Sequence, residues 1–310
     1  MNARWQQLLS LSMLLGPVAW GLWQWPRSPA LAWLGWGLAL AVGLVWMGLP
    51  FVLMQRANRA DAAPRARGPQ VLAAALREMA CAWRVFGWRQ PFRHQAVADC
   101  LTPPRAQPRP RGVVLLHGYL CNRGYWNPWI EALQARGHAC VAPTLEPAFG
   151  SIDDYVAQIE AAVQQVTQAT GRAPVLVCHS MGGLAARAWM RATPEADARV
   201  HRVITLGTPH GGTWLAQGSR TPNGLQMQRG SAWLQALAAQ EPPGRAQRFV
   251  CWYSNCDNIV FPASTACLAG ADHRFVGGVA HLEMAFVPQV MQVCLAEIAR
   301  DGAVVAKTTA

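Results

Sequence analysis

The sequence is almost without lysine: of its 27 basic residues only Lys307 is a lysine, and the others are arginines. Acidic residues are also scarce, 16 among 310 residues, so the formal net charge is +11. The arginines are not interleaved with aromatic residues in a nucleic-acid-binding motif, and we therefore expect no nucleic-acid partner. Their densest stretch, from Arg56 to Arg111, begins where an apolar segment ends, which favours anionic lipid headgroups as the neighbour.

Metal-binding and disulfide patterns are missing as well. No two of the nine cysteines form a C-x-x-C pair, and the sequence has neither a metal-ligand cluster nor an internal repeat. We therefore expect no metal and no cofactor. The odd number of cysteines, several in apolar runs around Cys140, Cys178 and Cys251, favours reduced thiols, although one disulfide is compatible with the count.

Charge is absent from two long apolar runs near the N-terminus, at about 8–25 and 30–54. A helix that crosses the hydrocarbon core needs about 20 apolar residues, so both runs predict transmembrane helices that form a hairpin within residues 1–55. Aromatic rings favour the headgroup layer, and four tryptophans flank the short loop between the runs: Trp20, Trp23, Trp25 and Trp33.

The orientation of the hairpin follows from the arginines at its outer ends, Arg4 on one side and Arg56 to Arg67 on the other. By the positive-inside rule we expect a bacterial inner-membrane protein with two spans, whose termini and C-terminal domain face the cytoplasm. A signal peptide would end in small residues and would not precede a second apolar run. A soluble core hairpin would show a polar face, which neither run has.

The connection at residues 56–111 is rich in arginine, alanine and proline, and has an amphipathic pattern from Val71 to Trp88. This stretch either lies on the membrane surface or packs as a helix on the domain that follows, and the sequence leaves both interpretations open. Prolines at 103, 104, 108 and 110 predict a turn or linker. In the first interpretation these side chains enter the bilayer: Leu72, Leu76, Met79, Trp83 and Phe86.

From Gly112 onward, short apolar runs alternate with helical patterns, which predicts a mostly parallel sheet with helices on both faces. We expect an α/β domain at 112–302, which holds the motifs described below, and a tail at 303–310. A capping box at Ser151 and Asp154 begins one of its helices. The expected strands are 113–116, 138–142, 175–178, 203–206, 249–253 and 274–277, and the expected helices are 125–135, 152–170, 183–192, 231–239 and 286–300.

The run from Cys178 to Gly183 lies between an apolar strand and a helical pattern. It matches the G-x-S-x-G nucleophile elbow, with Cys178 in place of the first glycine. Gly182 and Gly183 give strand and helix room to pack around a strained serine. Ser180 is therefore the candidate nucleophile, and the alternative is a serine that caps the helix.

The candidate acid and base follow Ser180 in the chain order serine, acid, histidine. Asp257 and His281 each come just after an expected strand, and chemistry collects at the carboxyl ends of parallel strands. His273 and Asp272 precede the last expected strand and should lie at the opposite edge. We therefore expect a hydrogen bond of about 2.6–3.2 Å between Asp257 and His281 Nδ1.

Acyl transfer requires two backbone N–H groups aimed at the developing oxyanion. The first expected strand ends in His117-Gly118-Tyr119, and Met181 follows the candidate nucleophile, so Tyr119 and Met181 are the expected donors. An ordinary strand-to-turn ending is the alternative for His117-Gly118. The expected supporting residues are His117, Gly118, His179 and Gly182.

The segments 113–119, 175–184 and 204–213 resemble bacterial triacylglycerol lipases and esterases of the α/β-hydrolase superfamily. Thr208 to Thr213 also resembles inositol deacylases of lipid anchors. The resemblance covers about 112–300 and implies an ester hydrolase acting on an acyl ester or lipid. The resemblance implies that Ser180 is the nucleophile and that His281 is the base and then the acid. It also implies that Asp257 orients the imidazole and that Tyr119 and Met181 donate to the oxyanion. The elbow has no aspartate nucleophile, which argues against dehalogenases and epoxide hydrolases.

The sequence leaves two interpretations for one segment, and two other functions were compared with ester hydrolysis. Residues 208–247 form a long, partly apolar connection, either a lid over the active site or a helix packed on the body. An inactive hydrolase-fold scaffold is the alternative function, weakened because decay would have removed at least one of the three candidate catalytic residues. A transporter is disfavoured by two spans without a charged residue. The sequence points to no protein partner.

Overall fold

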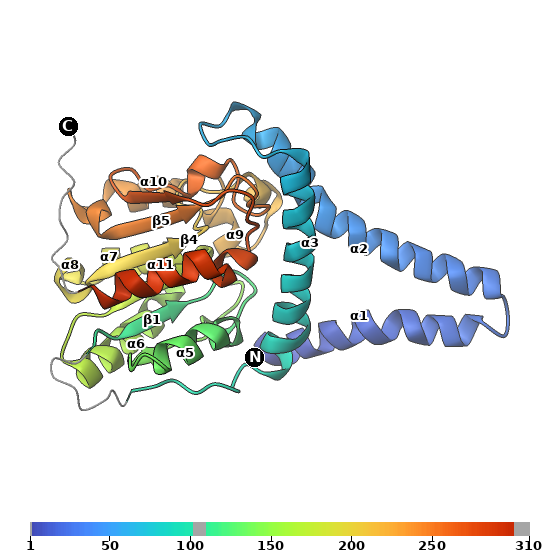
Figure 1. The fold of residues 1–310 in the computed structure, drawn as a ribbon, viewed down its shortest axis with the longest axis horizontal. Helices are drawn as coiled ribbons and strands as arrows, with labels where there is room; N and C mark the ends of the chain where they lie inside the picture. The colour runs from blue at the N-terminus through green and yellow to red at the C-terminus, as the bar shows by residue number, and fades with distance from the viewer. Residues whose placement is uncertain (1, 102–109, 301–310) are drawn as a thin grey trace.

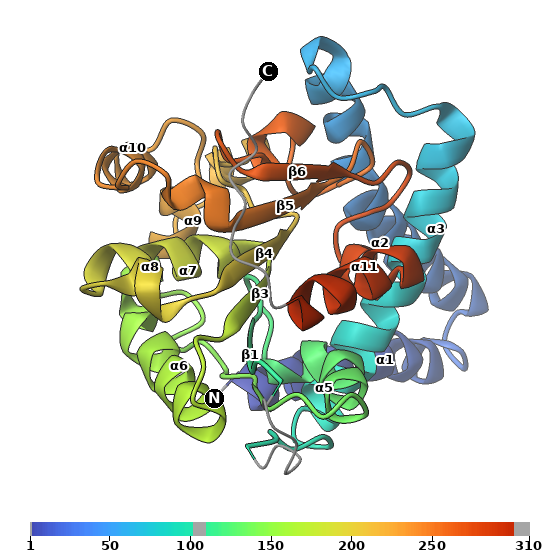
Figure 2. The same ribbon diagram turned by 60° about the vertical axis from the view of Figure 1, so that its left-hand side comes forward.

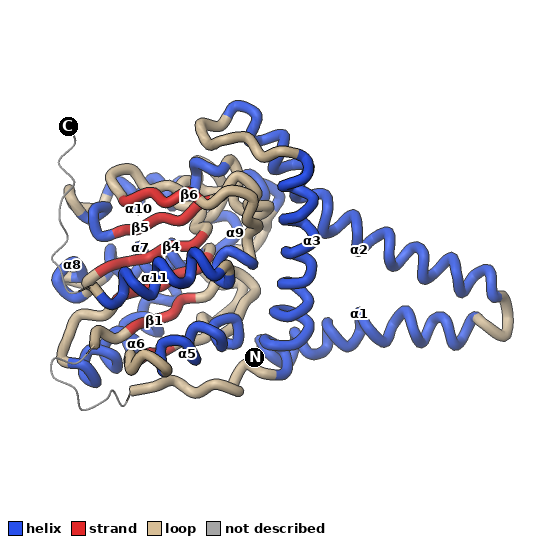
Figure 3. Tube along the Cα trace, viewed as in Figure 1, coloured by secondary structure: helices blue, strands red, loops and turns tan. Residues whose placement is uncertain are grey.

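We analysed a computed structural model of the chain, which describes residues 2–101 and 110–300. The expected tail at 303–310, the end of the expected catalytic domain and most of the expected proline linker lie outside the described residues. The described chain has two parts, an all-helical N-terminal arm and a body that holds the named strands (Figures 1 and 3).

The body is built on one six-stranded sheet with the order β2-β1-β3-β4-β5-β6, and all its strand pairs are parallel. The expectation of a parallel sheet is therefore confirmed. The strands are β1 (Val113–Leu116), β2 (Cys140–Val141), β3 (Val175–His179), β4 (Arg202–Leu206), β5 (Phe249–Tyr253) and β6 (Asp272–Phe275).

The bounds of four strands differ from those expected: β3 ends one residue later, at His179, β4 begins one residue earlier, at Arg202, and β2 and β6 differ more. β2 is shorter, and β6 begins at Asp272 because this residue pairs with Val250 near the start of β5. β6 ends at Phe275, where the chain turns through Gly278 at φ +73°. His273 and Asp272 therefore lie within the last strand, at its amino end, and not before it.

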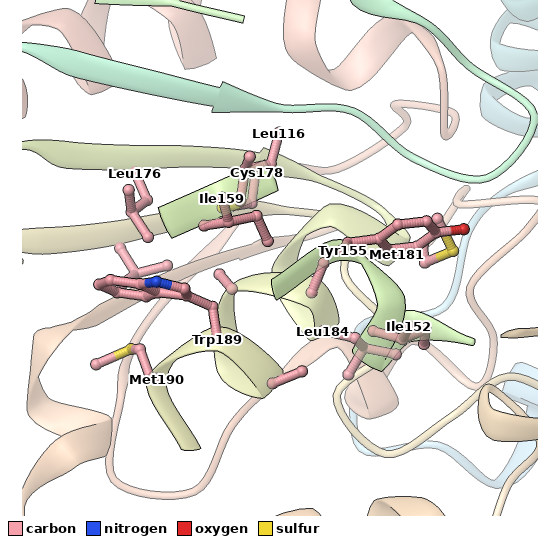
Figure 4. Close-up of a cluster of buried hydrophobic side chains, with 14 of the residues drawn as sticks. Leu116, Ile152, Tyr155, Ile159, Leu176, Cys178, Met181, Leu184, Trp189 and Met190 are labelled. Atoms are coloured by element: carbon pink, nitrogen blue, oxygen red, sulfur yellow. The ribbon is translucent and has the colours of Figure 1, made fainter. Parts of the chain in front are cut away.

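Alternating strand residues pack on opposite faces of the sheet, as the two-residue period of a strand requires. On one face Leu116, Leu176 and Cys178 meet α6 (Val156–Thr170) and α7 (Met181–Ala192), as Figure 4 shows. On the other face Leu115 and Val177 meet α5 (Asn127–Gln134) and α11 (Pro288–Ala299). Figure 2 shows the sheet between these two helical layers.

The expected capping box is present. The Ser151 hydroxyl accepts from the N–H of Asp153, and the Asp154 carboxylate accepts from the N–H of Ser151 at 2.8 Å. It starts the short turn η4 (Ile152–Tyr155), which leads into α6.

The segment 208–247 packs on the body. It contains η5 (Trp214–Gly218), α9 (Pro222–Gln226), α10 (Ala232–Ala239) and η6 (Arg245–Arg248). Met227, Leu234 and Leu237 are buried in the cluster that holds α7, which favours the packed interpretation over a lid.

The arm begins with α1 (Asn2–Gln24) and α2 (Pro29–Ala57), which project from the body as an antiparallel pair (Figure 1). At the tip of the pair, the Trp36 indole donates to the carbonyl of Pro17 at 2.8 Å. Of the described helices, only Pro29–Ala60 is both long and apolar enough to cross a membrane, with a mean hydropathy of 2.1. Ser10, Ser12 and Pro17 interrupt the apolar run of α1, so the expectation of two spans is supported for one helix only.

The arm continues through η1 (Asn58–Ala60) into α3 (Gly68–Arg84), η2 (Val85–Arg89) and α4 (Gln90–Phe92). α3 crosses the base of the α1–α2 pair and lies against the body (Figure 1). Its buried face holds Val71, Ala74, Glu78 and Cys81. Phe86 also packs on the body, so for this residue the interpretation of a helix packed on the body holds, and not insertion into the bilayer.

Candidate active site

The candidate nucleophile lies on a sharp turn between β3 and α7. Ser180 has φ 54° and ψ −129°, a strained conformation for a residue with a side chain. Its N–H donates to the carbonyl of Leu206 at 2.9 Å, and its carbonyl accepts from the Thr208 hydroxyl at 2.8 Å. The Ser180 side chain makes no capping hydrogen bond to α7, which argues against the alternative of a helix-capping serine.

The residues around Ser180 show why this turn needs small side chains. A Cβ atom on Gly182 would lie 2.4 Å from the carbonyl oxygen of Leu116, and one on Gly183 would lie 2.2 Å from the Thr208 hydroxyl. Cys178 takes the place of the first glycine of the motif and points into the core with no exposed surface. The cysteine therefore fits at this position.

The candidate acid and base meet after β5 and β6. His281 Nδ1 lies 3.0 Å from each carboxylate oxygen of Asp257, within the expected range. Asp257 Oδ1 also accepts from the N–H groups of Ile259 and Val260 at 3.0 and 2.8 Å, which fixes the carboxylate. The His281 N–H donates to Asn258 Oδ1 at 3.2 Å, which ties the two loops together.

Charge and burial act in opposite directions on the His281 imidazole. Burial alone would lower its pKa, but the negative charge and hydrogen bond of Asp257, with the charge of Glu78, leave the pKa raised above its ordinary value. The imidazolium form is thereby stabilised in a site that is 4% exposed. A general base in an ester hydrolase becomes an imidazolium as it takes the nucleophile's proton, so this stabilisation suits that role.

Gly207 links the candidate nucleophile to the acid and base. It follows Leu206, whose carbonyl holds the Ser180 N–H, and a Cβ on it would lie 2.7 Å from Asp257 Oδ2 and 3.1 Å from His281 Nδ1. All three candidate residues thus meet at one edge of the sheet. Neither Ser180 Oγ nor His281 Nε2 bonds to another group of the described chain, and such bonds often tighten only when substrate binds.

The His179 side chain holds the backbone of His281. Its Nε2 donates to the His281 carbonyl at 3.1 Å, and its ring stacks on Tyr125 with centroids 4.6 Å apart. Burial lowers the pKa of His179 well below its ordinary value, so this imidazole is neutral. The Tyr125 hydroxyl donates to the carbonyl of Leu282 at 3.1 Å and holds the same loop.

The expected oxyanion donors lie on both sides of Ser180. The N–H groups of Tyr119 and Met181 donate no hydrogen bond within residues 2–101 and 110–300. A Cβ on Gly118 would lie 2.8 Å from the Ser180 Cβ, so the turn that carries Tyr119 lies directly against the serine.

His117 braces this turn. The N–H of Leu145 donates to His117 Nε2 at 2.9 Å, which leaves Nδ1 to donate to the carbonyl of Gly118, also at 2.9 Å. Burial lowers the pKa of His117 to about 4, so the ring is neutral at physiological pH.

The rival residues lie away from the site. His273 Nε2 donates to the carbonyl of Leu268 at 2.7 Å, and Asp272 pairs with Arg274 at 2.9 Å. Both sit at the amino end of β6, the edge of the sheet where they were expected.

The residues that the arm brings to the site were not predicted from the sequence. Glu78 on α3 accepts from the N–H of Leu282 at 2.8 Å, one residue after His281. Asn58 accepts from the N–H of Ala263 at 3.0 Å, on the loop that carries Asp257. Gln6 donates to the carbonyl of Leu120 at 2.8 Å, beside Tyr119. For Glu78 a signal existed: it lies in a stripe with Val71, Ala74, Cys81 and Val85, spaced as one buried helix face.

In the described residues, no group of three or more His, Cys, Asp or Glu side chains could hold a metal ion. The groups that the site does bring together are a strained serine, a charge-stabilised histidine and two unpaired backbone N–H groups. This set is suited to nucleophilic attack on a carbonyl and to stabilisation of the oxyanion that results.

Comparisons with known proteins agree with the fold. Lipase BlEst2 of Bacillus licheniformis, in its mature form, superposes with a TM-score of 0.55 at 20% identity, over 64% of this chain and 96% of that one. Lipase B of Aspergillus fumigatus gives 0.55 at 17% identity, over 64% of this chain and 55% of that one. At such identities the likeness concerns the fold alone. No curated protein matches the sequence. The model of the alpha/beta hydrolase family matches residues 113–300, more than half of the chain, and the protein therefore belongs to this family.

Proposed function

We propose that the protein is a membrane-anchored serine ester hydrolase that cleaves acyl esters through Ser180, His281 and Asp257. The observation that carries this proposal is the contact of His281 Nδ1 with Asp257 at 3.0 Å, beside a serine held at φ 54° on the turn into α7. A strained serine on the turn between strand and helix, followed along the chain by a carboxylate and then a histidine, is the arrangement used for acyl transfer.

In the proposed reaction, Ser180 Oγ attacks the ester carbonyl carbon while His281 Nε2 takes the hydroxyl proton. Asp257 holds the imidazole by Nδ1 and stabilises the imidazolium. The N–H groups of Tyr119 and Met181 donate to the oxyanion. The C–O bond to the alcohol then breaks, and the alcohol leaves with the proton from His281.

The acyl group remains on Ser180 until water removes it. His281 takes a proton from the water molecule, whose oxygen attacks the acyl carbon, and then returns the proton to Ser180 as the carboxylic acid leaves. The cycle consumes one ester and one water, and yields an alcohol and an acid.

Membrane anchoring is supported by the surface of the arm. α1 and α2 expose apolar side chains along their length, among them Met13 at 73%, Leu40 at 65% and Trp46 at 79%. Exposed apolar surface of this extent is rare on soluble monomers. The proposed topology has two spans in a bacterial inner membrane, with both termini and the catalytic body in the cytoplasm.

The exposed side of α3 supports contact with the bilayer surface. Leu72, Leu76 and Trp83 are 63%, 59% and 57% exposed and follow one helix face, at the base of the α1–α2 pair. The arginines at the outer ends of the hairpin, Arg4 in α1 and Arg56 in α2, would meet anionic headgroups in this arrangement. The carboxyl ends of the strands, which carry the candidate site, also point towards α3 and the hairpin (Figure 1). A lipid ester is therefore the favoured substrate class.

An inactive scaffold is the alternative function. It is disfavoured because the site keeps a strained backbone at Ser180 and a buried, paired Asp257 and His281, features that cost stability and that binding alone does not need.

The test is hydrolysis of a panel of p-nitrophenyl and glyceryl esters by the full chain in lipid vesicles, with Ser180→Ala as the variant. We expect Ser180→Ala to lower kcat by about 10³-fold or more while its unfolding temperature stays close to that of the wild type. Turnover near the wild-type rate in this variant would reject Ser180 as nucleophile. A wild-type chain inactive on every ester would favour the scaffold.

A further inference from the structure

Glu78 is a fully buried carboxylate that reaches the candidate site from outside the hydrolase body. It is 1% exposed, and it lies on α3, before the segment 113–300 that matches the family. Its oxygens lie 2.8 and 3.0 Å from the N–H of Leu282 and 3.0 Å from the N–H of Glu283. These N–H groups belong to the two residues that follow His281.

Such a carboxylate is costly to bury, so its position requires compensation. Burial raises the pKa of Glu78 to about 7, while hydrogen bonds from the loop and the nearby imidazole of His281 act to lower it. The side chain is therefore ionised above neutral pH. Nothing in the sheet or in the packing of α3 requires a carboxylate here, since the neighbours on this helix face are Val71, Ala74 and Cys81.

We propose that Glu78 is a positioning residue for the proposed ester hydrolysis: it fixes the backbone next to His281 and its charge stabilises the imidazolium. This inference rests on the proposed function of Ser180, His281 and Asp257. Asp257 contacts the imidazole ring of His281 at Nδ1. Glu78 holds the backbone of the two residues that follow His281.

The arm as a whole holds all three loops of the candidate site. Asn58 binds the loop of Asp257, Glu78 the loop of His281, and Gln90 accepts from the N–H of Asn122 at 2.8 Å on the loop of Tyr119. Of these three contacts, the one from Glu78 places a negative charge near His281. The membrane-proximal arm is therefore part of the catalytic unit, and α3 connects the apolar stripe of Leu72, Leu76 and Trp83 to the histidine loop.

Several titratable groups face Glu78 and must be considered in a pH experiment. The positive charge of His281 lowers the pKa of Glu78, and the negative charge of Asp257 raises it. Glu283 is paired with Arg77 at 2.8 Å, so its charge is partly offset. The groups are His281 and Glu283 on the histidine loop, Asp257 on the acid loop, Arg77 and Cys81 on α3, and Tyr125 beneath His179.

The test compares Glu78→Gln and Glu78→Asp with the wild type in the full chain, in vesicles. Glu297→Gln is the matched control, because Glu297 is equally buried but pairs with Arg202 and Arg274 at the other edge of the sheet. We expect Glu78→Gln to lower kcat about tenfold, the effect of one charge-assisted hydrogen bond, with little change in KM. We also expect the acid limb of kcat/KM to move to lower pH, because loss of the negative charge makes the imidazolium of His281 less stable.

Glu78→Asp separates the effect of the negative charge from the effect of side-chain length. Its shorter side chain keeps the charge but cannot reach both N–H groups, so we expect a lower kcat with an acid limb close to that of the wild type. Glu297→Gln should leave both kcat and the acid limb unchanged. Unfolding temperatures are measured for each variant, and if Glu78→Gln does not fold, Glu78→Asp decides.

A folded Glu78→Gln or Glu78→Asp with wild-type kcat would overturn the proposal. A fall in kcat without movement of the acid limb in Glu78→Gln would reject the role of the charge. If these outcomes occur while Ser180→Ala is inactive, only the role of Glu78 is lost. If Ser180→Ala is as active as the wild type, the proposed function fails first.

Discussion

Backbone groups hold each of the three candidate catalytic residues in place. Ser180 is fixed by its N–H on Leu206, Asp257 by two N–H groups of its own loop, and His281 by its N–H on Asn258. Such bonds position a side chain without competing for the atoms that react. The geometry of the site thus depends on turns, and single substitutions in those turns should act on activity more than on folding.

Replacement of Asp257 by Asn tests the partner of His281. We expect kcat to fall by up to about 10⁴-fold, because Asn favours the wrong imidazole tautomer and does not stabilise the imidazolium. The pKa of His281 is raised by the charge of Asp257, so the acid limb of the remaining kcat/KM should move to lower pH. The measurement is a pH profile of ester hydrolysis.

Asp272→Asn is the control for this substitution, since it removes a carboxylate from the opposite edge of the sheet. It should keep wild-type kcat and the wild-type acid limb. A large loss of activity in Asp272→Asn, together with a mild effect of Asp257→Asn, would show that the acid has been assigned to the wrong residue.

Replacement of Gly207 by Ala tests how closely the elbow approaches the acid and base. Gly207 and Gly171 both have positive φ, +57° and +71°, so alanine should cost about 1–2 kcal/mol of stability at either position. Only at Gly207 would the added Cβ also meet Asp257 and His281, whereas at Gly171 nothing lies within 4 Å.

We therefore expect Gly207→Ala to lower kcat about 10²-fold, as misplacement of about 1 Å does, and Gly171→Ala to leave kcat unchanged. Ester hydrolysis and thermal unfolding of the two variants give the comparison. Equal kcat values in the two variants would contradict the close approach of Gly207 to Asp257 and His281.

Among the structural elements, those of the body were predictable from sequence and those of the arm only in part. The strands next to the site were found because short apolar runs such as 113–116 and 175–178 are buried on both sides, a strong signal in a parallel sheet. The positions of Ser180, Asp257 and His281 followed from their places after such runs. The start of β6 was missed because Asp272 and His273 are polar residues on a partly exposed edge strand.

α3 was harder to predict because it is apolar on two sides. One side, with Val71, Ala74 and Cys81, packs on the body, and another exposes Leu72, Leu76 and Trp83. The amphipathic pattern of this helix was recognised, but both faces offer apolar side chains, so the sequence alone could not assign either face to a partner.

The exposed face of α3 gives a prediction for this element. An environment-sensitive fluorophore on Leu76→Cys should shift its emission to the blue when the protein is moved from detergent into vesicles with anionic lipid. The same fluorophore on Arg84→Cys, an exposed position on another side of α3, should shift less. Labelled protein without either substitution corrects for the native cysteines. Equal shifts at both positions would contradict contact between this face and the bilayer.

On the scale of the whole molecule, the body presents the carboxyl ends of its strands to the arm, and the arm contacts three loops there. These contacts join residues more than one hundred positions apart, such as Gln6 with Leu120 and Glu78 with Leu282. Sequence periodicity reports local structure, so pairings over such separations were beyond its reach. The family motifs covered the body only and did not extend to the arm.

The proposed topology gives a prediction for the whole chain. A reporter that is active only in the periplasm should be silent when fused after Thr309, because both termini are expected in the cytoplasm. The same reporter inserted at Ser28, between α1 and α2, should be active. The reverse pattern would overturn the orientation. Silence at both sites would indicate that α1 and α2 do not cross the membrane.

The assignment of Ser180 as nucleophile is tested by the site at which the chain reacts with a fluorophosphonate, a reagent that forms a stable adduct only with an activated serine. The full chain in lipid vesicles is labelled, digested and analysed by mass spectrometry. We expect one adduct, on Ser180, which is lost in His281→Ala, because the hydroxyl is a weak nucleophile without its base. No adduct on the wild-type chain, or an adduct on another serine that survives in His281→Ala, would contradict this assignment.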